Sequence, residues 1–248
     1  MTTIRAYHRP DTLEAALALL AHADSDATVL AGGTVINGTP DHDPIELVDL
    51  QGLGLDSIAA DGDRLEIGAM CRLQDLVDSD LVPAQIRDLA HREAPNTIRQ
   101  AATCGGTVAA ADPESELLAG LLAFEAVVSV VHSIGSESIP LADLLEEPER
   151  LGLGIITSVS IAVGGDAVSE RTARTPADRP IVMAVARRGE DGAVRLAMTG
   201  VAATPVLVDP GDVASLQPPG DFRGSTVYRR RVAGVLADRV MSRLGETS

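Results

Sequence analysis

The chain has 248 residues, 45% hydrophobic and 23% charged, which is enough to bury a core and form two or three small lobes. Its formal net charge of −16, from 36 acidic and 20 basic residues, disfavours nucleic acid and anionic membrane surfaces as partners. No apolar run approaches the roughly 18 residues of a membrane span, and residues 1–10 lack the apolar core of a secretory signal. We therefore expect a cytoplasmic protein without a membrane span.

The N-terminal segment predicts a helix and two strands. Apolar residues share one face of residues 11–22, and Asp11 and Glu14 have the spacing of a capping box, which together predict a helix. Short apolar runs at residues 27–31 and 45–50 predict strands. A Gly-Gly turn and a Pro- and Asp-rich loop separate the two runs, so this segment predicts a compact first lobe.

The middle segment alternates short apolar runs with helical patterns, which predicts an α+β lobe. The strands are expected at residues 64–69, 126–132 and 155–163, and the helices at residues 73–77 and 114–124. Glu114 and Glu116 fall in the first turn of the second helix, where acidic residues suit the helix dipole without any ligand.

The C-terminal segment begins after the glycine pair at residues 164–165. Residues 169–179 are polar without periodicity and are expected to form a linker. Two strands are predicted at residues 181–187 and 193–203, followed by a Pro- and Gly-rich loop at residues 205–220.

A long final helix is predicted to begin at Ser225 or Thr226 and to end near Gly245. Its three consecutive arginines, at residues 229–231, are expected to form a solvated face, with a functional basic patch as the alternative. Its predicted apolar stripe comprises Val232, Val235, Leu236, Val240 and Leu244.

The tripeptide Gly-Gly-Thr occurs twice, at residues 32–34 and 105–107, each time after an apolar or extended run. Glycine lets successive backbone N–H groups approach a ligand without a Cβ in the way, and threonine adds a hydroxyl donor. Two such loops, one from each lobe, could hold the two phosphates of a diphosphate. The alternative is that both glycine pairs only make turns, because neither loop matches a known phosphate-binding motif.

Other chemistry is weakly indicated by the sequence. Cys71 and Cys104 form no C-x-x-C motif and the five histidines form no ligand-spaced pair, so no metal site is predicted. Cys104 is expected to be a small buried residue, with a reactive thiol as the alternative. Aromatic residues make up only 2% of the chain, so a planar ligand would be held mostly by aliphatic side chains and backbone.

Taken in order, six segments of the chain resemble the FAD-binding medium subunit of the molybdenum hydroxylases, the xanthine dehydrogenase and carbon monoxide dehydrogenase family. The likeness spans nearly the whole chain and is carried by "YHRPDTLEAALALLA", "VLAGGT", "IELVDLQGL", "DRLEIGAMCRLQDL", "IRQAATCGGTVAAADPESELLAGLLAFEAVV" and "STVYRRRVAGVLADRV".

The resemblance implies an α+β fold with a two-lobed FAD-binding domain of the PCMH type and a small C-terminal α+β domain, an antiparallel sheet with a helix. The expected boundaries are residues 1–54, 55–165 and 166–248. It also implies an oxidoreductase subunit that receives electrons from an iron-sulfur small subunit, beside a molybdenum-cofactor large subunit. Bound FAD would pass these electrons to NAD, oxygen or another acceptor.

Carried over by position, the resemblance implies a set of FAD-binding residues and no catalytic side chain. The first loop would comprise Ala31, Gly32, Gly33, Thr34, Val35 and Ile36, and the second Thr103, Gly105, Gly106 and Thr107, each donating N–H and hydroxyl hydrogen bonds. Further contacts would come from Glu116, Ile156 and Arg174.

The chain departs from the family at several of these positions. Glu116 stands where the family usually has Asp, Arg174 falls roughly where many members carry Lys, and Gln100 and Thr107 replace two asparagines. An aromatic segment expected at the start of the third lobe is replaced by "SERTARTPADRP". Two alternatives therefore stand beside the electron-transfer subunit: a scaffold subunit that no longer binds FAD tightly, and a stand-alone flavin reductase.

Overall fold

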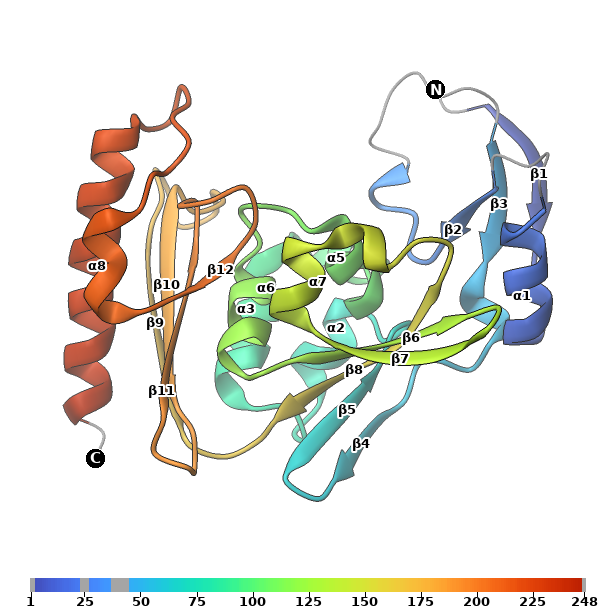
Figure 1. Cartoon of the computed structure of the whole chain (residues 1–248), viewed down its shortest axis with the longest axis horizontal. Coiled ribbons are helices and arrows are strands. Elements are labelled where there is room, and N and C mark those ends of the chain that lie inside the picture. Colours follow the sequence, from blue (N-terminus) through green and yellow to red (C-terminus); the bar gives the residue numbers. More distant parts are fainter. Residues whose placement is uncertain (1–2, 23–26, 37–44, 247–248) are drawn as a thin grey trace.

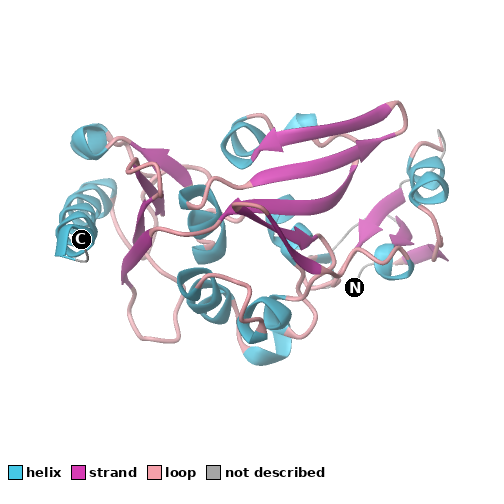
Figure 2. Cartoon of the chain, turned by 90° about the horizontal axis from the view of Figure 1, so that it is seen from below, coloured by secondary structure: helices cyan, strands magenta, loops and turns pink. Residues whose placement is uncertain are grey.

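The computed structural model describes residues 3–22, 27–36 and 45–246. Three β-sheets follow one another along the molecule, with helices packed between and beside them (Figures 1 and 2). They form an α+β fold, as predicted, and the C-terminal sheet is antiparallel and packs against a helix. The core consists of three clusters of buried side chains, of which the central one is the largest.

The first sheet is parallel, with the order β1 (Ile4–His8), β3 (Ile45–Asp49), β2 (Ala27–Leu30). Parallel neighbours need a crossover, which here includes α1 (Leu13–Leu20), as the apolar pattern predicts. The cap of this helix differs from the prediction. Thr12, and not Asp11, accepts the backbone N–H of Ala15 at 3.2 Å. The Pro- and Asp-rich loop predicted before Ile45 falls in residues 37–44, outside the described residues.

The second sheet is antiparallel and has five strands in the order β4-β5-β8-β6-β7. The predicted strands appear as β5, β6 and β8, whereas β4 and β7 are largely exposed and gave no apolar signal. The strands are β4 (Ile58–Asp61), β5 (Arg64–Gly68), β6 (Val127–His132), β7 (Gly135–Pro140) and β8 (Ile155–Ala162).

Six short helices accompany this sheet, and several of them were not predicted. They are α2 (Leu73–Asp78), α3 (Ala84–Glu93), α4 (Asn96–Arg99), α5 (Cys104–Ala110), α6 (Glu116–Ala123) and α7 (Leu141–Glu146). Every residue of α6 is buried, because this helix contacts α3 on one side and strands of the C-terminal sheet on the other. Ser115 caps it by accepting the N–H of Leu118 at 3.0 Å, so Glu114 lies outside the helix.

The C-terminal sheet has the order β12-β11-β10-β9, and α8 covers one of its faces (Figure 1). Two predictions are wrong here. Residues 169–179 are not only a linker, since β9 runs to Thr172, and the loop at residues 205–220 contains a strand and a 3₁₀ helix, Pro210–Ser215. The elements are β9 (Asp166–Thr172), β10 (Val182–Arg188), β11 (Val194–Thr199), β12 (Val206–Val208) and α8 (Thr226–Glu246).

Strand β10 is apolar on both faces and is buried on both. Val182, Ala184 and Ala186 belong to the cluster formed with α8. Met183 and Val185, which point the other way, belong to the large central cluster of the middle lobe. The middle lobe and the C-terminal sheet therefore share one continuous apolar core.

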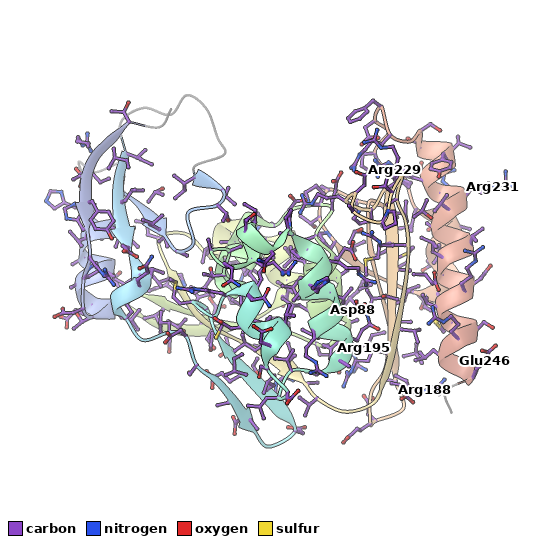
Figure 3. All side chains as sticks on the ribbon, turned by 180° about the vertical axis from the view of Figure 1, so that it is seen from behind. Asp88, Arg188, Arg195, Arg229, Arg231 and Glu246 are labelled. Atoms are coloured by element: carbon purple, nitrogen blue, oxygen red, sulfur yellow. The ribbon has the colours of Figure 1, made fainter. Side chains whose placement is uncertain are left out.

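Helix α8 begins as predicted, with the Ser225 hydroxyl accepting the N–H of Tyr228 at 3.2 Å. The prediction for its arginines is wrong at the first of them. Arg229 is only 3% exposed and lies on the sheet side of α8, whereas Arg231 lies on the outer side (Figure 3). The prediction also placed Val235 in the apolar stripe, but this side chain is exposed. Ala233 and Ala237 complete the buried stripe instead. Within the described residues, α8 included, we find no helix long and apolar enough to cross a membrane.

Candidate functional site

A cavity of about 360 Å³ lies where the first lobe meets the middle lobe. Both Gly-Gly-Thr loops line it, which is what a shared ligand requires. Its walls are otherwise mostly aliphatic, from residues such as Leu50, Met70, Leu73, Ile98, Leu151 and Ile155. The predicted residues that line it are Ala31, Gly32, Gly33, Thr34, Val35, Ile36, Thr103, Gly105, Gly106, Thr107 and Ile156.

Gly32 brings the first loop into direct backbone contact with the segment that precedes the second loop. A Cβ built on Gly32 would lie 1.9 Å from the carbonyl oxygen of Ala101 and 3.1 Å from the Cα of Ala102. No side chain fits at this distance. The first loop can therefore lie against the segment before the second loop only because residue 32 is glycine.

The first loop leaves backbone donors available to a ligand. Within the described part of the chain, the N–H groups of Gly32, Gly33 and Thr34 make no hydrogen bond. Gly33 has a φ of 69°, the left-handed conformation that glycine adopts readily. Consecutive N–H groups around such a residue form a concavity that suits an anion.

The second loop differs from the prediction, because the N–H groups of Gly105, Gly106 and Thr107 already have partners within the protein. Thr103 caps α5, accepting the N–H of Gly106 on its hydroxyl at 3.1 Å and that of Thr107 on its carbonyl at 2.9 Å. The N–H of Gly105 donates to the carbonyl of Ala69 at 2.9 Å. Of the two loops in the described part of the chain, the first therefore leaves more backbone N–H groups without a protein partner.

Three charged residues that the sequence analysis missed lie in the wall of the cavity. Arg179 lies 2.5 Å from an oxygen of Asp112 and 3.4 Å from one of Glu93. Burial raises the pKa of the Glu93 carboxyl, and the N–H of Leu117, which donates to it at 2.9 Å, opposes that rise. Arg179 falls within the stretch expected to be a linker, so nothing in its local sequence marked it.

Two predicted site residues lie away from the cavity lining. Glu116 is only 2% exposed and forms ion pairs with Arg92 and Arg171. Arg174 is exposed, contacts Asp178 at 3.5 Å and lines a second hollow beyond Arg179. The structure therefore does not bring either side chain to the glycine loops.

Both cysteines are buried, Cys104 within the second loop at the start of α5, which agrees with the prediction of a small buried Cys104. Burial raises the pKa of Cys104 to about 12 and that of Cys71 to about 11. Because the thiolate is the reactive form, we expect neither thiol to react with iodoacetamide in the native protein at pH 8, and both to react after denaturation. Mass spectrometry of the alkylated chain would check this, and rapid native labelling of Cys104 would contradict it.

The cavity has the features that FAD requires. The first loop offers three adjacent N–H groups to a diphosphate, Gly32 lets the second loop approach, and the aliphatic walls suit planar rings. The fold and the site thus define a protein with a ligand cavity between two lobes, and the residues present fit FAD.

Comparison with known proteins gives the family. The model described as "FAD binding domain in molybdopterin dehydrogenase" matches residues 2–162, and the chain belongs to this family of FAD-binding oxidoreductase subunits, with FAD as its cofactor.

Individual relatives cover nearly the whole chain. It is 32% identical to the uncharacterized protein YgfM of Escherichia coli K12, over 94% of this chain and 93% of the relative. It is 28% identical to the carbon monoxide dehydrogenase medium chain of Afipia carboxidovorans, over 96% and 95%. The solved structure of reconstituted CO dehydrogenase from Oligotropha carboxidovorans superposes with a TM-score of 0.86 at 26% identity, covering both chains completely. The chain is thus a medium-chain FAD-binding subunit of the molybdenum hydroxylase type.

Proposed function

We propose that this chain is the electron-transfer flavin subunit of a molybdenum hydroxylase complex, with an iron-sulfur small subunit and a molybdenum-cofactor large subunit as partners. The observation that carries the proposal is the cavity in which the two Gly-Gly-Thr loops meet at Gly32. The similarity to a carbon monoxide dehydrogenase medium chain, which belongs to a complex of several chains, supports the choice of partners.

The residues of this chain bind and orient the cofactor. The N–H groups of Gly32, Gly33 and Thr34 would hold the diphosphate, and the hydroxyl of Thr103 would add a donor from the second loop. Leu50 and the other aliphatic wall residues would exclude water from the rings. Bound FAD would supply the redox chemistry, electron transfer between the iron-sulfur partner and NAD, oxygen or another acceptor.

The first test is reconstitution of the full chain with FAD. We expect the protein, after removal of free cofactor by gel filtration, to keep flavin absorption bands at about 375 and 450 nm. Co-expression with the candidate partner subunits is expected to yield a complex that carries the same bands. A folded chain that keeps no FAD, alone or in the complex, would contradict the proposal.

A second candidate function is a scaffold subunit that holds FAD weakly. It is favoured by the second loop, whose N–H groups are already engaged, and by Arg179, whose charge is balanced by Asp112 and Glu93. This candidate predicts an intact complex without flavin. The absorbance of the purified complex therefore separates the two functions.

A further inference from the structure

Glu116 lies at a junction of three elements and not in the cavity. Its side chain is 2% exposed and projects from α6 between Arg92 of α3 and Arg171 of β9. One carboxylate oxygen accepts a hydrogen bond from Nη1 of Arg171, and the other lies 2.9 Å from Nε of Arg92. A buried carboxylate between two guanidinium groups is held strongly, because removing the carboxylate leaves both cations without this buried counter-charge.

Arg171 extends this junction into the segment that joins β9 to β10, residues 173–181. Its Nη1 also donates to the carbonyl of Asp178, at 3.1 Å, and its Nη2 donates to the carbonyl of Pro176. The carbonyl of Asp178 belongs to the peptide bond that leads into Arg179. The planar guanidinium thus fixes the backbone immediately before Arg179 while it pairs with Glu116.

Arg179 is the residue that this segment places at the cavity. In the described part of the chain, it is the only lysine or arginine among the residues that line the cavity. Asp112 and Glu93, which also line the cavity, contact its guanidinium. An anionic ligand would meet there one guanidinium, which is already paired with two carboxylates and is held in place through its backbone and its side chain.

We propose that Glu116 is a positioning residue for FAD binding, acting through Arg171 to hold Arg179 against the bound cofactor. The inference rests on the proposed function and deepens it, because it assigns Arg179 as the cationic contact of the cavity. It also replaces the expectation that Glu116 itself touches the cofactor.

The test is a double-mutant cycle on the dissociation constant of FAD, measured by flavin fluorescence with the full chain. Glu116→Gln and Arg179→Met are each expected to weaken binding about tenfold, and the double variant is expected to be no weaker than either single variant. Additive losses would show that Glu116 acts independently of Arg179 and would overturn the proposal, as would unchanged affinity in a folded Glu116→Gln chain.

Two further variants keep the test decisive if Glu116→Gln fails to fold. Arg171→Lys keeps the charge beside Glu116 but loses the fork to the two carbonyls, so it should weaken FAD binding to the same degree and speed hydrogen exchange in residues 173–181. Asp88→Asn, which removes only the exposed partner of Arg92, is the control and should change neither. If Arg171→Lys leaves both readouts unchanged, the inference fails, whereas a wild-type chain that binds no FAD contradicts the proposed function itself.

Discussion

The substitution Gly32→Ala is expected to weaken FAD binding more than tenfold and to destabilise the native chain. The added methyl group would lie 1.9 Å from the carbonyl oxygen of Ala101, and this neighbour is backbone that no rotamer change can move. One of the two loops must shift, at a cost of roughly 1–3 kcal/mol. That shift separates the open N–H groups of the first loop from the second loop, so we expect FAD binding to weaken as well as the fold to lose stability.

Flavin fluorescence titration and thermal unfolding would measure these two effects. Gly234→Ala is the matched control, because it makes the same chemical change within α8, where nothing lies within 4 Å of the new Cβ. It should leave FAD binding unchanged and stabilise the helix by roughly 0.5–1 kcal/mol. Wild-type affinity in a folded Gly32→Ala chain would mean that the contact between the loops does not shape the site.

The second large effect is expected from Arg229→Met, which should lower the free energy of unfolding by roughly 3–5 kcal/mol. Arg229 is buried between α8 and its sheet and donates to the carbonyls of Ile181, at 2.6 Å, and Gly200, at 3.2 Å. It also pairs with Asp221 at 2.6 Å. Methionine fills a similar volume but removes the donor of the two buried carbonyl contacts, whereas the exposed carboxylate of Asp221 can turn to water.

Urea unfolding of the full chain would measure the loss, and Arg231→Met is the control. Arg231 is two residues further along the same helix, on its outer side, so its replacement should change stability by no more than roughly 0.5 kcal/mol. Equal effects of the two substitutions would refute a structural role for Arg229.

The sequence predicts the parts of this molecule that rest on local pattern. Short apolar runs located the strands β5, β6 and β8, and apolar residues that recur on one helix face located α1 and the long helix α8. The two Gly-Gly-Thr loops could be proposed as one site from the sequence, because glycine lets backbone N–H groups approach an anionic ligand without a Cβ in the way. Their convergence on one cavity is the structural counterpart of that proposal.

The sequence could not predict contacts between residues far apart in the chain. Arg179 reaches the cavity through a fold that brings it beside Glu93, and Glu116 meets Arg171 across 55 positions. A run of three arginines looks the same whether or not its first member is buried, and only the packing of α8 distinguishes Arg229 from its neighbours. The engaged N–H groups of the second loop are likewise a property of the folded cap at Thr103.

The continuous core beneath β10 has a consequence for how this protein is divided. The family match ends at residue 162, yet Met183, Val185 and Ala197 complete the apolar cluster of the segment before that boundary. An excised family domain would expose to water the part of this cluster that these three residues cover. The segment that the family model matches is therefore smaller than the unit that shares this apolar core, which extends into the C-terminal sheet.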